Sequence, residues 1–436
     1  MEHRLREINS SEQKEISLIE FCRILFPVNR SLSGQGVRDT LKYLNLFIRD
    51  FKIKKIRSEK KIYDWNVPLE WKIESAHIKD SAGNKIIDMS DSNLHVVGYS
   101  EPINQELTKE ELFRHLHFIE DYPNAIPYVT SYYKKTWGFC VQFDKLDLFI
   151  NEPFTVEINS KLFKGFLNYG ETTIKGKSKK EIVFSTNICH PSMANNELSG
   201  PAVLVGLLSE LQNRINLRHT YTFLFLPETI GSLIYIKRNF RRLKKKMLAG
   251  FVVTCVGDGA PFSYIPSRNG NTYSDKIAKF ALRDKDFINY TWLDRGSDER
   301  QFCSPGVDLP FCSVTRSKYR EYKEYHTSED NLNFISNEAL NESLQYYLDV
   351  IYIIENNVKL VSIQKGEPNL GKRNLYSTLS KRGSTESSLE YLNVLSYCDG
   401  SYDLIDISLN CDLNFKKTVS IAELLLELKL VRILEK

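Results

Sequence analysis

A buried strand that leads directly into a histidine and then a helix constrains the fold of this 436-residue chain more than any other feature. Residues 182–188 are mostly apolar or β-branched, and Cys189-His190-Pro191 follows them. After a short polar turn, Ser199-Gly200 begins a helical pattern that continues to Leu208. Open α/β sheets place ligands and chemistry at the carboxyl ends of their strands. The stretch therefore favours an α/β sheet with His190 at its functional edge over a packing or surface histidine.

The alternation of strand and helix continues through the second half of the chain. Apolar runs predict strands at 181–188, 221–226, 250–256 and 311–315, and helical periodicity predicts helices at 199–212, 229–240 and 336–355. This rhythm favours a largely parallel sheet with helices on both faces. Helical spacing also fills residues 12–50 around a turn-rich loop at 26–36, so we expect these helices to join the same layers.

Two regions depart from the α/β rhythm. Residues 62–160 contain short strand-like pieces, turns and three of the four tryptophans, which indicates a small β-rich module with its own core. Residues 373–436 predict three helices and a short strand-like ending. We therefore expect three domains. They are an α/β domain of residues 1–62 and 161–362, an inserted β-rich domain of 63–160, and a helical C-terminal domain of 366–436.

Charge and composition exclude several classes of function. A net charge of +4 on a chain of this length gives no electrostatic case for nucleic acid or membrane as the main partner. No apolar run approaches the roughly 18 residues that a bilayer span needs, and the first residues do not resemble a signal peptide. The eight cysteines contain no Cys-x-x-Cys pair, which is typical of reduced thiols. We expect a cytoplasmic protein.

Polar residues follow several of the predicted strands. His190 follows the first, Glu228 the second and Asp258 the third, while His326 lies in a later polar loop. Each has a plain structural alternative, such as a helix cap for Glu228 or a turn for Asp258. Together, however, they would supply nitrogen and carboxylate oxygen at one edge of the sheet. That supply suits zinc, with one carboxylate left to manage the proton of a water molecule.

Seven sequence segments, in order along the chain, match a known family. They are Leu25–Ser31, Trp65–Trp71, Asn93–Ser100, Ile126–Tyr133, Cys189–Ser192, Pro227–Ser232 and Tyr325–Leu332. On these segments the chain resembles, almost end to end, a bacterial aminopeptidase-like branch of the zinc aminopeptidase superfamily. The resemblance implies a three-layer α/β/α sheet, a small inserted domain, a C-terminal winged-helix-like domain and a link to polysaccharide biosynthesis.

The resemblance also implies roles for the strand-end residues. His190 matches the first zinc-ligand histidine, Asp258 the later aspartate on the same metal, and His326 the histidine on a second metal. Glu228 matches the general-base glutamate.

Two departures from the family pattern bear on the number of metal ions. Asn196 stands where the superfamily has an aspartate that bridges both metals, and Thr229 stands where a second glutamate would bind zinc. An amide oxygen is neutral and cannot offset the repulsion between two cations. We therefore predict at most one tightly bound zinc, held by His190 and Asp258 with His326 or water. Glu197 could reach inward as a substitute, and an empty or weakened site is the other alternative.

The C-terminal domain has the wrong charge for binding DNA. From residue 366 onward there are nine Lys or Arg and ten Asp or Glu, a net charge of −1, whereas phosphate contacts need clustered positive charge. We expect this domain to pack on the α/β domain or on a second subunit, which makes a homo-oligomer one alternative.

These observations support two hypotheses for the function. The first is a zinc-dependent aminopeptidase-like hydrolase, with a degenerate two-metal site, that cleaves an amide or peptide bond of a small amine-bearing substrate. The alternative is a catalytically impaired binding or assembly protein that keeps the fold and the pocket. In either case the aromatic-rich module could lean over the pocket, or its aromatic residues could only fill the module's own core.

Overall fold

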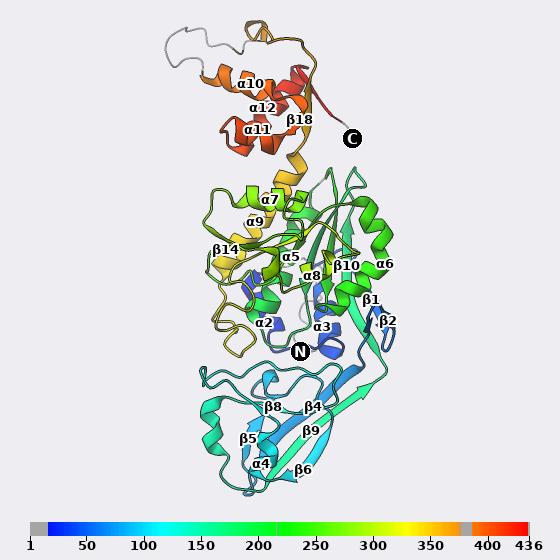
Figure 1. Cartoon of the computed structure of the whole chain (residues 1–436), viewed down its shortest axis with the longest axis vertical. Coiled ribbons are helices and arrows are strands. Elements are labelled where there is room, and N and C mark those ends of the chain that lie inside the picture. The colour runs from blue at the N-terminus through cyan, green and yellow to red at the C-terminus, as the bar shows by residue number, and fades with distance from the viewer. Residues whose placement is uncertain (1–15, 215, 374, 376–385, 435–436) are drawn as a thin grey trace. The chain divides into compact units, whose positions relative to one another are not determined.

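The computed structural model describes residues 16–214, 216–373, 375 and 386–434. These residues form two compact units, one ending at Tyr347 and the other beginning at Leu348 (Figure 1). The first unit contains the predicted α/β fold and the β-rich module, and the second contains the C-terminal helices.

An eight-stranded sheet organises the first unit. Its order is β1 (Lys52–Arg57), β10 (Phe166–Ile174), β12 (Thr220–Leu226), β11 (Glu181–Asn187), β13 (Met247–Val252), β16 (Phe311–Thr315), β14 (Phe262–Ile265) and β15 (Phe287–Asn289). The four strands β12, β11, β13 and β16 are parallel, while β10 and β14 run antiparallel to their neighbours β12 and β16. Every residue of β11 is buried, as expected for a central parallel strand covered on both sides.

Successive residues of β11 show the two covered faces. Phe184 contacts Tyr347 of α9 (Asn337–Asn356) at a ring-centroid distance of 5.9 Å. Val183 points to the opposite face, where it belongs to the same apolar cluster as Ile234 of α6 (Ile230–Lys246). The structure is therefore a three-layer α/β/α sandwich, as predicted.

Other helices complete the layers around this sheet (Figure 1). They are α2 (Leu18–Leu25), α3 (Gln35–Leu44), α5 (Ser199–Gln212), α7 (Tyr273–Leu282) and α8 (Glu299–Phe302). The predicted helices at 199–212 and 336–355 are confirmed almost to the residue. The N-terminal pair is confirmed as Leu18–Leu25 and Gln35–Leu44, whereas residues 45–50 are not helical and residues 12–15 of that prediction lie outside the described residues.

The predicted strand at 250–256 is displaced in the structure. β13 begins at Met247 and ends at Val252, so residues 253–256 are not part of the strand. Cys255 has a positive φ of 51°, which no β-strand accommodates. The chain therefore turns away from the sheet just before Asp258. The short strands β14 and β15 and the helix α7 were not predicted.

The β-rich module contains a second sheet of four strands. Its order is β5 (Lys85–Asp88), β4 (Glu70–Lys79), β9 (Phe154–Phe163) and β6 (Ile103–Leu107), with α4 (Lys109–Phe113) beside it. Residues 94–99, one of the strand-like pieces of this region, do not form a strand: Asn93–His95 form a 3₁₀ turn in which the Ser92 hydroxyl accepts from the Leu94 amide. The apolar side chains of that segment, Leu94 and Val97, pack in a small cluster with Ile126 and Cys140. The module boundaries of 63 and 160 stay a prediction.

The second unit combines helices with a small sheet. Its helices are α10 (Glu386–Ser396), α11 (Leu404–Asn410) and α12 (Phe415–Glu427), and its strands are β17 (Lys359–Ser362), β18 (Asp399–Asp403) and β19 (Val431–Ile433). The three strands pair in the order β18-β17-β19. The three helices and the final strand were predicted. The strands β17 and β18 were missed, and β18 consists of mostly exposed, polar residues without an apolar alternation.

Among the described residues, no helix combines the length and the apolar character that crossing a membrane requires.

Candidate active site

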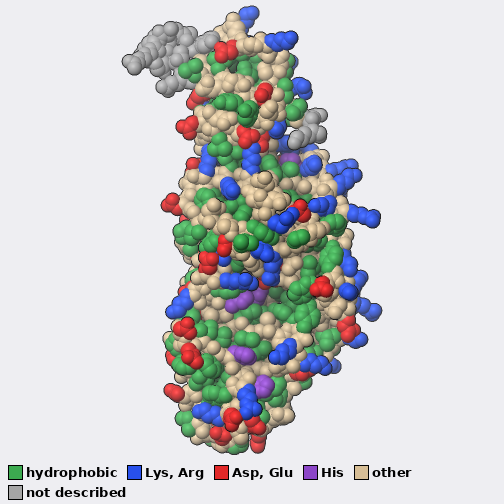
Figure 2. Space-filling model, in the orientation of Figure 1, with side chains coloured by type: hydrophobic (Ala, Val, Ile, Leu, Met, Phe, Trp, Pro, Cys, Tyr) green, Lys and Arg blue, Asp and Glu red, His purple; other side chains and the backbone are tan. Residues whose placement is uncertain are grey.

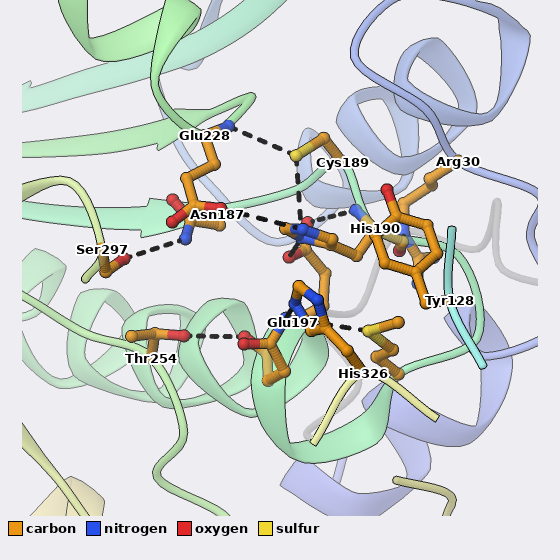
Figure 3. Close-up of polar contacts among 12 residues, drawn as sticks. Arg30, Tyr128, Asn187, Cys189, His190, Glu197, Glu228, Thr254, Ser297 and His326 are labelled. Atoms are coloured by element: carbon orange, nitrogen blue, oxygen red, sulfur yellow. Dashed lines mark hydrogen bonds and ion pairs between the residues drawn. The ribbon is translucent and has the colours of Figure 1, made fainter. Parts of the chain in front are cut away.

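The carboxyl ends of two adjacent parallel strands bring the key side chains together (Figure 3). Cys189 and His190 follow the end of β11, and Glu228 follows the end of β12. Since β11 and β12 are paired in parallel up to Asn187 and Leu226, the two loops leave the sheet at the same edge. The Glu228 amide donates to Cys189 Sγ at 3.2 Å, which joins the two loops.

A strained turn fixes the backbone immediately after Glu228. Thr229 has φ 66° and ψ −72°, and the Ile230 amide donates to the Glu228 carbonyl at 2.8 Å. This is a γ-turn with a β-branched residue in its strained central position. The Thr229 amide donates to Asp298 Oδ1 at 2.7 Å, and the Ser232 hydroxyl donates to the same oxygen at 3.0 Å. Asp298 therefore stabilises a backbone conformation that is otherwise costly.

The His190 ring is held by Glu197. His190 Nδ1 lies 2.6 Å from Glu197 Oε2, and the His190 amide donates to Glu197 Oε1 at 2.9 Å. Burial opposes charge on the ring, but Cys189 and Glu197 outweigh it and raise the pKa of His190 well above its usual value. Arg30 donates from Nε to the His190 carbonyl at 2.8 Å. Burial lowers the pKa of Arg30 to about 10, and nearby Glu197 opposes that shift.

Glu228 faces the other nitrogen of the same ring. Its Oε2 lies 3.7 Å from His190 Nε2. Burial raises the pKa of the Glu228 carboxyl, against the opposing effects of His190 and Arg300. Burial also raises the pKa of the Cys189 thiol to about 11, against the opposing effect of His190.

His326 lies beside His190, as the strand-end argument anticipated. The two ring centroids are 5.1 Å apart, and Tyr325 stacks on His326 at 3.9 Å. The His326 carbonyl accepts from the Tyr128 amide at 2.8 Å, so the β-rich module helps to position this residue. Burial lowers the pKa of His326 well below its usual value, and His190 and Arg320 lower it further, so the ring is neutral.

Asp258 is engaged in a separate hydrogen-bond network. Its Oδ1 accepts from Asn195 Nδ2 at 2.9 Å and from the Ser317 amide at 3.2 Å. Its Oδ2 accepts from the Ser317 hydroxyl at 2.6 Å and the Ala260 amide at 3.1 Å. The carboxylate does not line the pocket that contains His190 and Glu228. Its assignment as a metal ligand stays a prediction.

The turn that carries Asn196 and Glu197 explains how adjacent side chains can both point inward. Ala194–Leu198 form one turn of π-helix, a feature common at functional sites. The Asp330 carboxylate accepts from the amides of Asn195 at 2.6 Å and Asn196 at 2.9 Å, which holds the turn. Asn196 Nδ2 lies 3.5 Å from His326 Nε2, while Glu197 points to His190. Asp330 was not predicted, although it belongs to the quoted segment around His326.

Cys189, His190, Glu228 and His326 line a cavity of about 330 Å³. Figure 2 shows one face of the first unit, where histidine side chains are visible between basic and apolar ones. The β-rich module contributes five lining residues, namely Trp65, Tyr128, Thr130, Tyr132 and Tyr133. Of the two alternatives left open for the module, the structure supports the one in which its aromatic residues reach the pocket. Sequence reasoning missed Arg300 and Arg320, which also line the cavity.

Comparisons with known proteins place this fold and site in a family. A family model described as a domain of unknown function (DUF4910) matches residues 19–357, and a winged helix-turn-helix model matches residues 358–433. The chain belongs to the DUF4910 family. A Clostridium acetobutylicum protein, provisionally named as a polysaccharide biosynthesis protein with an aminopeptidase-like domain, is 38% identical over 438 residues, covering 99% of this chain and 100% of that protein.

Solved structures confirm the aminopeptidase fold. A crystal structure from Clostridium acetobutylicum, provisionally described as a peptidase, superposes with a TM-score of 0.89 at 37% identity over 96% of each chain. A zinc aminopeptidase from Bacillus subtilis gives 0.55 at 14% identity, covering 77% of this chain and 93% of that one. A peptidase M28 precursor from Shewanella amazonensis gives 0.56 at 12% identity, with coverages of 84% and 98%. The latter two similarities concern the fold alone.

The donor atoms beside the cavity include types that bind a zinc-type ion. Among the described residues, Cys189, His190 and Glu197 form the one group whose potential ligand atoms all lie within 4.8 Å of one another. Glu197 is already engaged with His190 Nδ1, an arrangement that leaves Nε2 as the metal-binding nitrogen. Asn195 and Asn196 contribute no negative charge. That at most one ion binds tightly stays a prediction.

Proposed function

We propose that this protein is a cytoplasmic, zinc-dependent hydrolase that cleaves an amide or peptide bond of a small, amine-bearing substrate. The name of the Clostridium relative supports a place in polysaccharide biosynthesis. The same name and the shared fold support an aminopeptidase-like reaction. The cavity of about 330 Å³ supports a small substrate.

The proposed division of roles follows from the contacts of each residue. His190, oriented by Glu197, would release the proton of Nε2 and hold the ion through that nitrogen, and His326 would supply a neutral nitrogen. Asp258, the other proposed anchor, would have to release its hydrogen bonds from Ser317 to reach the ion. A bound ion of this type polarises a carbonyl and lowers the pKa of water.

Glu228 would move the proton. Its carboxylate faces the cavity beside His190 Nε2, and burial raises its pKa, which improves a carboxylate as a base. In the proposed reaction Glu228 accepts a proton from the attacking water and returns it to the leaving amine. The γ-turn at Thr229 and the bond to Asp298 keep this side chain directed at the cavity.

The observation that carries the proposal is the 3.7 Å approach of Glu228 Oε2 to His190 Nε2 at the floor of a cavity. The test is a panel of aminoacyl amides and aminoacylated sugars, assayed with and without added zinc. We expect zinc-dependent turnover that falls by at least about a hundredfold in Glu228→Gln. Glu110→Gln, at a position 82% exposed on α4, is the matched control and should retain full activity. Turnover in Glu228→Gln equal to wild type would refute the role of this residue.

A binding protein without turnover is the second candidate. It is favoured by the neutral Asn196 and by the Asp258 carboxylate, whose oxygens already accept four hydrogen bonds. For this candidate, the wild-type protein and Glu228→Gln would bind the same panel with equal affinity. Neither protein would release product after zinc loading, which elemental analysis would verify.

A further inference from the structure

The charged side chains that line the cavity are mostly positive. Arg300 and Arg320 carry permanent positive charges, and among the described residues that line the cavity the single carboxylate is that of Glu228. Burial and the nearby negative charge of Glu228 raise the pKa of the Asp298 carboxyl to about 7. The cavity therefore offers more positive than negative charge to a ligand.

Arg300 has hydrogen-bonding capacity to spare. Its Nη2 donates to the Thr229 hydroxyl at 2.6 Å. Its Nε is buried and has no hydrogen-bond partner within the described part of the chain. No carboxylate of the described residues forms an ion pair with it within 4.0 Å. Burying a donor without a partner costs about 1–3 kcal/mol, and a ligand oxygen would remove that cost.

Arg320 is free to meet a ligand at the mouth of the cavity. It is exposed, and its guanidinium forms no hydrogen bond or ion pair with any residue that the structure describes. Its backbone is in the left-handed region at φ 69°, on the loop that carries Tyr325 and His326. An arginine recognises carboxylate and phosphate through paired N–H donors.

Two aromatic side chains from the β-rich module face the same cavity. Trp65 is 40% exposed and Tyr133 is 55% exposed, with ring centroids 6.1 Å apart. The Tyr133 hydroxyl donates to the Asn66 carbonyl at 2.7 Å, which fixes the ring. Together with Arg300 and Arg320, these rings form a surface that suits the apolar or ring portion of a ligand next to an anionic group.

We propose that the substrates of this site carry an anionic group, a carboxylate or a phosphate, that binds Arg300 and Arg320 while the scissile amide faces His190 and Glu228. This inference rests on the proposed function for the position of the amide. The proposal excludes basic peptides as substrates, because both arginines would repel a positively charged side chain of the substrate.

The test compares alanylalanine with its C-terminal amide, which differs only by the loss of the negative charge. Binding is measured by calorimetry on zinc-treated Glu228→Gln, so that no turnover is needed. We expect the free dipeptide to bind at least about tenfold more tightly than the amide. Arg320→Gln, combined with Glu228→Gln, should weaken the preference, while Arg114→Gln, at the C-cap of α4 and 69% exposed, should leave it unchanged. Equal binding of the two probes, or a preference as large in Arg320→Gln as in the Arg114→Gln control, would overturn the inference.

Two further arms distinguish the source of the anion and separate the two proposals. Competition by inorganic phosphate stronger than by acetate would assign a phosphorylated substrate, and the reverse would assign a carboxylate. Failure of both anions to displace the dipeptide would count against the inference. Turnover by the wild-type protein without any preference for anionic substrates would support the proposed hydrolase and refute this inference alone. Thermal melting curves identify any variant that fails to fold.

Discussion

Glu197 holds His190 through both the ring and the backbone. Its two carboxylate oxygens lie 2.6 Å from the ring Nδ1 and 2.9 Å from the amide nitrogen. The side chains of His190 and Glu197 are 5% and 0% exposed, so water does not compete for these contacts. The residue next to Asn196, where the chain departs from the family pattern, is therefore the one that orients the histidine. The hypothesis that Glu197 reaches inward agrees with this geometry, although it reaches His190 and not a bridging position.

Glu197→Gln should destabilise the protein and weaken its affinity for zinc. A glutamine can still accept from one nitrogen of His190, but its NH₂ group then opposes the second donor. The buried guanidinium of Arg30 also loses the nearby negative charge of Glu197. We expect a loss of about 3 kcal/mol in unfolding free energy and of roughly 10- to 100-fold in zinc affinity. Urea unfolding and zinc titration measure the two effects.

Glu210→Gln is the control for this change, since Glu210 is exposed on α5. It should alter neither the unfolding free energy nor the zinc affinity. A Glu197→Gln protein as stable as the control would show that the buried contact contributes nothing.

Asp298→Asn should change how stability depends on pH. Burial and then Glu228 raise the pKa of Asp298 to about 7, far above its ordinary value of 3.8. A raised carboxyl pKa means that the folded state holds the proton more tightly, so this contribution is complete below about pH 4 and is lost as pH rises through 7. Since one pKa unit is about 1.4 kcal/mol, wild type should lose a few kcal/mol from this group over that window.

The asparagine variant retains the bonds of Asp298 Oδ1 to Thr229 and Ser232, because the other oxygen has no partner among the described residues. Its unfolding free energy should therefore vary less between pH 4 and 7 than that of wild type. Denaturant unfolding at several pH values measures this difference. Parallel curves for the two proteins would contradict the assigned pKa.

The parts of the site that the sequence predicted are those that depend on local pattern. β11 and the position of His190 follow from an apolar run and the residues directly after it, and Glu228 follows β12 in the same way. The direction of Glu197 depends on a π-helical turn that Asp330 stabilises from 133 positions later in the chain, which no local pattern reveals. Asp258 lies away from the pocket because residues 253–256 leave the strand. The convergence of Arg300, Arg320 and Trp65 is a product of tertiary structure alone.

Gly200→Ala should destabilise the protein, because it disturbs the packing of α5 against β11. A Cβ at this position would collide with the Thr186 hydroxyl and the Val253 carbonyl, and neither can move without disturbing β11 or the chain after β13. Overpacking of a rigid site costs about 1–3 kcal/mol. Gly259→Ala is the matched control, because a Cβ there meets nothing within 4 Å. Thermal unfolding of both variants tests the difference, and equal melting temperatures would refute it.

Asn196→Asp should create affinity for a second metal ion, because it adds a carboxylate next to His326. In the wild-type protein Asn196 Nδ2 lies 3.5 Å from His326 Nε2, so an aspartate there would place a negative oxygen beside a neutral ring nitrogen. Two zinc ions about 3.5–4 Å apart need such an anionic ligand between them. We therefore expect elemental analysis to give at most one zinc per wild-type chain, more than one in Asn196→Asp, and none in His190→Ala. Two zincs in the wild-type protein would refute the one-ion prediction.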